Sequence, residues 1–128
     1  MEHRRRSSAH AIAAVFIAFS LSTWPVAAHH GWSTYGDTEF EVTGTVETAL
    51  SVGGPHATLR IRSNGQVWDV TLAPGPRTVE AGLKEGMIPV GAQVTAKGHR
   101  SRDAKRFEIK TEKLVWNGRT FNVYPNRS

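Results

Sequence analysis

The feature that most constrains this fold is an alternation of apolar and polar residues that returns in several short segments. Phe40, Val42 and Val46 alternate with polar residues, which is the period-two pattern of a half-buried strand. The same alternation recurs in residues 56–62, 66–72, 94–99 and 107–114. The period therefore predicts an all-β domain in which each strand turns one face to the core.

Turn residues separate these segments. Asn64-Gly65 and Asn117-Gly118 each predict a two-residue hairpin, because a type I′ turn needs positive φ at both central positions. Pro76 suits the first turn of a short helix over Arg77–Ala81, with Gly82 as its C-terminal cap. Short strands with one small helix between the third and fourth predict a five- to six-stranded Greek-key barrel of the OB type. A small β-sandwich is the alternative.

The inward faces of the predicted strands supply the expected core. Its members are Val42, Val46, Leu59, Ile61, Trp68, Val70, Leu72, Val94, Phe107 and Ile109. We expect this apolar set to fold without a metal ion. The opposite faces, which carry His99 and charged residues such as Lys110 and Glu112, are expected to be solvated.

An export signal is predicted over residues 1–28. Arg4-Arg5-Arg6 supplies a positive start, and Ala11–Leu21 supplies a short apolar run. Val26-Ala27-Ala28 supplies the small residues that a signal peptidase reads. The alternative, a membrane-spanning anchor, needs roughly 20 apolar residues, and polar residues interrupt this run before that length. We therefore expect an exported protein, periplasmic or secreted, that does not span the membrane after cleavage.

Cleavage at this site makes His29 the first mature residue. We expect residues 29–39 to form an extended arm pinned by Trp32 and Tyr35, and residues 40–128 to form the barrel. Three of the 16 Lys and Arg residues and one of the 11 acidic residues precede the cleavage site, so the mature net charge is +3. The absence of cysteine from the sequence excludes disulfides and thiolate metal sites.

Neither nucleic-acid binding nor catalysis is predicted. Single-stranded nucleic acid stacks on exposed aromatic residues along a basic groove. Here Trp68 points inward by alternation, and the basic residues are mixed with acidic ones such as Asp69. The sequence also has no cysteine nucleophile and no Gly-x-Ser-x-Gly turn, so no catalytic residue is assigned.

A series of motifs resembles a known family. In order they are HHGWSTYGD, VTGTV, GPH, LAPGPRTVEAGL and VGAQVTAKGHRSRD. This order is similar to that of a family of small exported bacterial proteins known as a domain of unknown function. Members typically have Asn-Pro-His where this chain has Gly54-Pro55-His56. The resemblance covers essentially the whole mature chain. It implies an exported location and a β-barrel-like fold, and it supplies no activity.

Histidines at the mature start favour a copper(II) site. A chain that begins with His29 offers an amine and an imidazole on one residue, and copper(II) prefers such nitrogen donors. His30 or His56 would complete the donor set, and His99 is a weaker candidate. Cleavage after Ala27 would instead place His30 third, which is another chelating arrangement. The competing interpretation is that these histidines are ordinary solvated residues.

The alternative function needs no metal. An OB-like module could bind an envelope ligand or a partner protein on the outward face of its second and third strands. That face comprises Thr58, Arg60, Arg62, Asp69 and Thr71. The basis for this alternative is analogy with other barrels of this fold.

Overall fold

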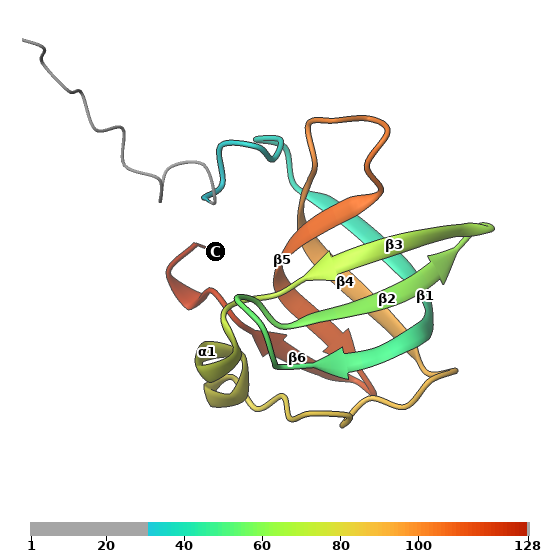
Figure 1. Cartoon of the computed structure of the whole chain (residues 1–128), viewed down its shortest axis with the longest axis vertical. Coiled ribbons are helices and arrows are strands. Elements are labelled where there is room, and N and C mark those ends of the chain that lie inside the picture. The colour runs from blue at the N-terminus through green and yellow to red at the C-terminus, as the bar shows by residue number, and fades with distance from the viewer. Residues whose placement is uncertain (1–30, 128) are drawn as a thin grey trace, which may run out of the picture.

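The computed structural model describes residues 31–127, which contain six strands and one short α-helix (Figure 1). The elements are β1 (Phe40–Ser51), β2 (Thr58–Ser63), β3 (Gln66–Thr71), α1 (Gly75–Glu80), β4 (Gln93–Arg100), β5 (Glu108–Trp116), β6 (Arg119–Asn122) and the 3-10 helix η2 (Pro125–Arg127). The predicted signal peptide lies outside the described residues, as do His29 and His30. Within residues 31–127, no helix has the length and apolar character needed to cross a bilayer.

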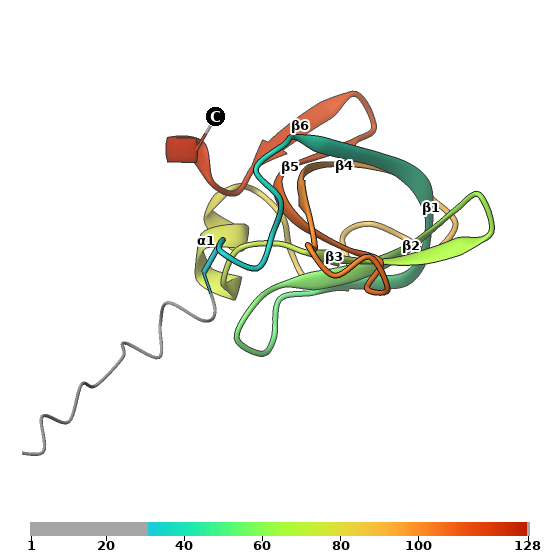
Figure 2. The same ribbon diagram turned by 90° about the horizontal axis from the view of Figure 1, so that it is seen from above.

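The strands form one sheet in the order β3-β2-β1-β4-β5-β6, and a parallel pairing of β3 with β5 closes the first five into a barrel (Figure 2). The pairings between neighbours in that order are antiparallel. β6 is an extra strand that pairs with Lys113–Trp116 of β5, along the same edge that β3 pairs with at the start of β5. The predicted OB-like Greek-key barrel, all-β with one short helix, is therefore confirmed, and the sandwich alternative is wrong.

β1 is long enough to pair with two strands in succession. It pairs with β4 from Phe40 to Thr45 and with β2 from Thr45 to Ser51. Gly44 lies next to this change of partner, where an added Cβ would come within 2.4 Å of the Arg62 carbonyl oxygen. Glycine allows the two backbones to approach, and this close approach helps β1 to curve around the barrel.

The predicted turns and helix are present. Asn64 and Gly65 have φ values of 49° and 77°, and Asn117 and Gly118 have 53° and 73°, as a type I′ hairpin turn requires. The helix begins at Gly75, two residues before the predicted start. It ends before Gly82, whose φ of 104° is unfavourable for other residues.

The barrel interior holds the predicted core. Nine of the ten predicted residues are buried, and Phe107 is half-buried against them. Further core residues come from the later parts of β1 and β5, from the residue before β2, from β6 and the residue after it, and from the loop after α1. They are Leu50, Ala57, Leu83, Ile88, Leu114, Phe121 and Val123. The loop after α1 therefore closes one part of the core instead of lying free on the surface.

Candidate functional site

The segment before β1, residues 31–39, lies on the outside of the barrel beside the end of β4 (Figure 2). The Gly36 amide donates to the Arg100 carbonyl at 2.8 Å. The Arg102 amide in turn donates to the Thr34 carbonyl at 2.9 Å. These backbone bonds join the segment to the end of β4 and to the loop that follows it, so the segment covers part of the β4–β5 surface.

Trp32 and Tyr35 anchor this segment, as the sequence predicted, although the segment is not extended throughout. The Tyr35 amide donates to the Trp32 carbonyl at 3.0 Å and closes a turn. The Trp32 ring meets the rings of Tyr124 and His99 edge-on, with centroids 5.0 and 5.7 Å apart. The Arg127 guanidinium carbon lies 3.9 Å from the Trp32 ring centroid, a cation–π contact. One aromatic residue therefore connects the segment to β4 and to the C-terminal turn.

Glu108 collects several hydrogen bonds at the start of β5. The Tyr35 hydroxyl donates to Glu108 Oε1 at 2.5 Å, and the Thr71 hydroxyl donates to the same oxygen at 3.1 Å. Arg106 pairs with Oε2 at 3.0 Å. Burial raises the pKa of the Tyr35 phenol well above its ordinary value, and the hydrogen bond to Glu108 and that carboxylate's charge add to the increase. The tyrosine is therefore held as a neutral donor.

A pocket of about 280 Å³ lies beside this carboxylate, and it brings Gly31 and His56 together. Its other lining residues are Thr34, Tyr35, Thr71, Ser101, Arg106, Glu108 and Lys110. His56 is half-buried in the loop between β1 and β2. Gly31 is the first described residue and directly follows His30 in the chain. The pocket thus joins His56, a predicted ligand, to the segment that follows His29 and His30 in the sequence.

Lys110 lines the same pocket and is not solvated, contrary to the sequence prediction. The residue is only 4% exposed, because the segment covers the outward face of β5. Its Nζ lies 4.9 Å from the Trp32 ring centroid and 5.6 Å from that of Tyr35. Burial lowers the Lys110 pKa, the charge of Glu108 opposes this, and Arg127 adds to the decrease.

His99 and Glu112 are buried too, so their predicted exposure is also wrong. They are 8% and 4% exposed, respectively. His99 Nε2 lies 3.0 Å from Glu112 Oε1, and Nδ1 lies 2.8 Å from the Gly36 carbonyl oxygen. Alternation correctly directs these side chains away from the barrel interior, but the segment covers His99, and Arg127 of the C-terminal turn contacts Glu112.

Of the predicted metal ligands, the structure places His56 alone. His29 and His30 lie outside the described residues, and His99 is engaged in the buried pair with Glu112. Among residues 31–127, no three His, Cys, Asp or Glu side chains are grouped so as to hold a metal ion. Residues 31–127 alone therefore supply no three-ligand site of these residue types at His56.

The predicted ligand face on β2 and β3 is exposed, and its charges are paired. Arg60 Nε lies 2.8 Å from Asp69 Oδ1, opposite it in the sheet register, and Arg62 pairs with Glu47. Thr71 is half-buried and hydrogen-bonded to Glu108, so it belongs to the pocket beside His56 as well. The face of Thr58, Arg60, Arg62, Asp69 and Thr71 thus has its arginines paired with Asp69 and with Glu47 of β1, and it shares Thr71 with the pocket.

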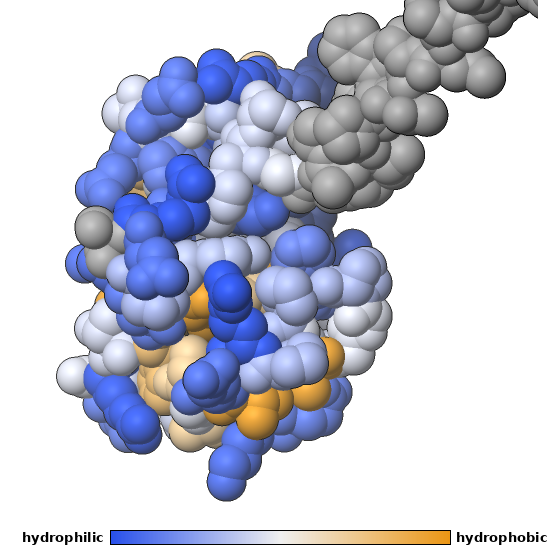
Figure 3. Space-filling view, turned by 90° about the vertical axis from the view of Figure 1, so that its left-hand side faces the viewer, coloured by the Kyte–Doolittle hydropathy of each residue, from blue (hydrophilic) through white to orange (hydrophobic). Residues whose placement is uncertain are grey.

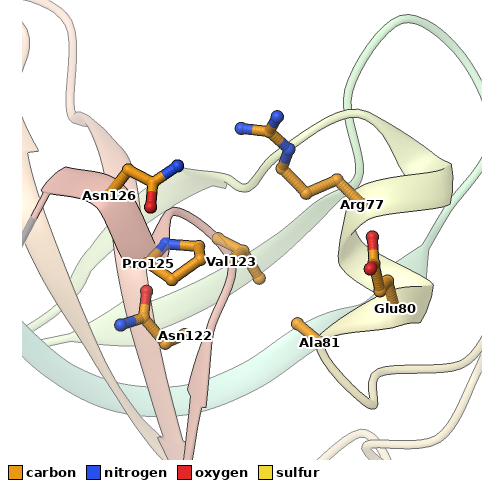
Figure 4. A pocket seen from close by; sticks show the side chains of 7 residues that line it. All are labelled: Arg77, Glu80, Ala81, Asn122, Val123, Pro125 and Asn126. Atoms are coloured by element: carbon orange, nitrogen blue, oxygen red, sulfur yellow. The ribbon is translucent and has the colours of Figure 1, made fainter.

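A second hollow of about 250 Å³ lies between α1 and the C-terminal turn (Figure 4). It is lined by Arg77, Glu80, Ala81, Asn122, Val123, Pro125 and Asn126. In the close-up, side chains from α1 face those from β6 and the C-terminal turn across the opening. A space-filling view of this side shows apolar residues gathered in its lower part, below a mainly polar region (Figure 3). This lining contains the amides of Asn122 and Asn126, the charged groups of Arg77 and Glu80, and no histidine.

Sequence reasoning missed three residues of the covered surface. Glu108, Lys110 and Glu112 occupy alternate positions on β5, which is the ordinary pattern of a solvated strand face. Trp32 and Tyr35 were the available signal, because two aromatic residues in a short polar segment need a surface on which to bury their rings. The sequence did not show which surface that was.

The fold and the covered pocket define a small OB-like barrel protein with a segment bound across β4 and β5. A family described as being of unknown function, DUF6152, matches residues 17–110, and the chain belongs to this family. The family resemblance predicted from the motifs is thereby confirmed. No curated protein gave a significant match.

Solved structures show similarity of fold. The ZRD-deleted mutant of TiaS in complex with agmatine has a TM-score of 0.50 and 13% identity, over 66% of this chain and 26% of that one. The Stn1-Ten1 complex of S. pombe has a TM-score of 0.45 and 13% identity, over 61% of this chain and 57% of that one. The chain thus spans about a quarter of the TiaS chain, and this likeness concerns the barrel alone.

Proposed function

We propose that this protein is an exported binding module that holds one copper(II) ion at the start of its mature chain. The observation that carries the proposal is the pocket shared by His56 and Gly31. A chain of two residues spans about 7 Å at most, and this reach from Gly31 would allow the His29 amine and the His29 and His30 imidazoles to approach the pocket. His29 would chelate through its amine and ring, and His30 or His56 would add nitrogen donors.

The proposed copper site depends on export, because the backbone amine of His29 becomes available as a ligand only after a signal peptide has been removed. Intact mass of protein secreted by its native host tests the start. A mass beginning at His29 is expected. A mass that retains Ala28 would shift the site to the alternative chelate with His30 in third position, and a full-length mass would contradict both.

Copper titration tests the site itself. Three proteins are compared: one starting at His29, one with an extra N-terminal Met, and a His56→Ala variant with the authentic start. We expect the authentic start to bind one Cu(II) at least about tenfold more tightly than the Met-extended protein. Electron paramagnetic resonance should show a nitrogen-rich tetragonal signal. Arg62→Ala, whose side chain pairs with Glu47 and does not line the pocket, is the control and should leave the affinity unchanged.

The fold is expected not to depend on this ion, because the barrel core is complete without it. The buried apolar residues come from all six strands and the loop after α1. Circular dichroism of the authentic-start protein should therefore be the same before and after treatment with a chelator. Unfolding on chelation would show that the metal is structural and that the appended site is the wrong description.

The metal-independent alternative uses the β2–β3 face. Thr58, Arg60, Arg62 and Asp69 are exposed there and could meet an envelope ligand or a partner protein. Its pairing of each arginine with a carboxylate leaves little net charge to attract nucleic acid. Binding at this face would not depend on the N-terminus. Equal and weak copper affinity in all three titrated proteins would therefore contradict the copper proposal and favour the metal-independent alternative. We assign no catalytic residue under either function.

A further inference from the structure

We propose that one end of the barrel binds an anionic amphiphile, which is a molecule with an apolar body and one carboxylate or phosphate group. This site is separate from the pocket beside His56, and the inference does not rest on copper binding. The observation that carries it is Arg100, a half-buried arginine at the end of β4. Within residues 31–127 its guanidinium has no carboxylate partner, and it lies against the aromatic rings that line another pocket.

This pocket has a volume of about 440 Å³ and lies where β1, β3 and β5 begin and β2 ends. Its apolar lining comprises Phe40, Val42, Trp68 and Phe107. Val42 and Trp68 are buried, whereas Phe40 and Phe107 are half-buried. Pockets for small molecules commonly have volumes of roughly 300–1,000 Å³ and mainly apolar walls, and the mouths of β-barrels are among their usual places. This end of the barrel therefore has the size and lining that suit the apolar body of a ligand.

The Arg100 guanidinium lies against this aromatic lining. Its central carbon is 4.9 Å from the Trp68 ring centroid, 5.2 Å from that of Phe107 and 5.9 Å from that of Phe40. The rings also pack on one another, because the Trp68 centroid is 5.3 Å from each of the other two. Cation–π contacts of this length attract a guanidinium to the rings. The positive charge is therefore held next to the rings that form the pocket.

Arg100 has hydrogen-bonding capacity to spare. A guanidinium carries five N–H donors, and within residues 31–127 Arg100 makes one hydrogen bond, from Nη2 to the Ala104 carbonyl oxygen at 3.3 Å. Five other arginines of these residues each pair with a carboxylate, namely Arg60, Arg62, Arg102, Arg106 and Arg127. Arg77 and Arg119 do not, but they are exposed to water, whereas Arg100 is half-buried. A carboxylate or phosphate in the pocket would supply the bidentate acceptor that Arg100 lacks within residues 31–127.

The loop after β4 adds positive charge at this end of the barrel. Residues 100–106 include four basic residues and one acidic residue, and Lys105 among them is exposed. Glu41 also lines the pocket, but its carboxylate lies 3.7 Å from Lys97 Nζ, which compensates its charge. The local excess of positive charge therefore favours an anionic head group over a cationic one.

A purely structural role for Arg100 is the competing interpretation, because a guanidinium on three rings could simply seal the end of the barrel. The two interpretations differ in what a charge on the ligand contributes. A structural arginine gives an anion no advantage over a neutral molecule of the same length. An anion site favours the anion and loses that preference when the guanidinium is removed.

Titration of metal-free protein, secreted by its native host, with three short amphiphiles tests the site. Octanoate and octyl phosphate carry the two candidate head groups, and octanol is the neutral molecule of the same chain length. We expect at least one of the two anions to bind about tenfold more tightly than octanol. NMR shifts of the Phe40, Trp68 and Phe107 rings should accompany binding. The anion that binds more tightly identifies the head group.

Arg100→Gln is the variant that separates an anion site from a structural arginine. It should lower the affinity for the anion to that for octanol, while the affinity for octanol stays as in the wild type. Arg119→Gln is the matched control. Arg119 also lacks a carboxylate partner within residues 31–127, its guanidinium carbon lies 4.8 Å from the Phe121 ring centroid, and it does not line this pocket. The control protein should keep the wild-type preference.

Three results would overturn the proposal. The first is a wild-type affinity for both anions that is no higher than that for octanol. The second is a set of NMR shifts that leaves out the three rings, and the third is an Arg100→Gln protein that still prefers the anion. If Arg100→Gln does not fold, the wild-type affinities and NMR shifts still decide the matter.

Discussion

Two cross-strand pairs of polar side chains on the barrel differ in whether other parts of the chain cover them. Arg60 and Asp69, on β2 and β3, have side chains that are 59% and 57% exposed. His99 and Glu112, on β4 and β5, have side chains that are 11% and 6% exposed. Both pairs point away from the barrel interior. Strand alternation therefore decides which way a side chain points. Whether water reaches that side chain depends on segments from elsewhere in the chain that pack over it.

Removing the covered carboxylate should have the largest effect on stability. Glu112→Ala leaves the His99 imidazole and the Arg127 guanidinium without their shared acceptor in a buried place. Breaking a buried pair in this way costs about 3 kcal/mol. Urea unfolding at pH 6 measures the loss. A cost below about 1 kcal/mol, the range of exposed pairs, would show that the β4–β5 surface is not covered in solution.

Removing one hydroxyl beneath the segment should have an intermediate effect. Tyr35→Phe deletes the donor to Glu108 and is expected to cost about 1 kcal/mol, since Thr71 and Arg106 still bond the carboxylate. The sign of its pH dependence follows from the raised Tyr35 pKa. Above about pH 10 tyrosine ionises in the unfolded chain before it does in the fold, so wild-type stability falls as the pH rises.

The Tyr35→Phe protein should therefore lose less stability than the wild type when both are unfolded in urea at pH 8 and again at pH 11. Tyr124→Phe is a useful comparison, because burial raises the pKa of Tyr124 in the same direction without a bond to Glu108. Identical pH dependence in the wild type and the Tyr35→Phe protein would mean that the Tyr35 hydroxyl is exposed to water.

Breaking the open pair should have the smallest effect. Asp69→Ala removes the partner of Arg60 on a solvated face, and such pairs contribute about 0.5 kcal/mol or less. Unfolding at low and at high salt should show a difference that shrinks as salt rises. A loss as large as that of Glu112→Ala would remove the distinction between the two surfaces.

The barrel could be predicted from the sequence because its signals are local. Alternation, the two Asn-Gly turns and the glycine after α1 each report on neighbouring residues. The surface under the segment depends on contacts between distant residues, such as Tyr35 with Glu108 and His99 with Gly36. A register shift between Lys97 and Gly98 in the β4–β5 pairing adds an irregularity that a regular period does not reveal.

The candidate site was predictable in part for the same reason. His56 could be chosen from its residue type and its place before β2, but its pocket partners come from four other parts of the chain, which are the segment before β1, β3, the loop after β4, and β5. Glu108 was not selected, because a glutamate in an alternating strand resembles any solvated charge. Its role as an acceptor for Tyr35, Thr71 and Arg106 becomes visible only once the barrel has closed.

The most direct test of this account is where copper lies on the folded protein. One equivalent of Cu(II), added to protein starting at His29, broadens the NMR signals of nearby nuclei because the ion is paramagnetic. We expect selective broadening at Tyr35, His56 and Glu108, which line the covered pocket, with Arg62 on the open face unaffected. Broadening of Arg60 and Arg62 with a sharp His56 signal would contradict the copper proposal.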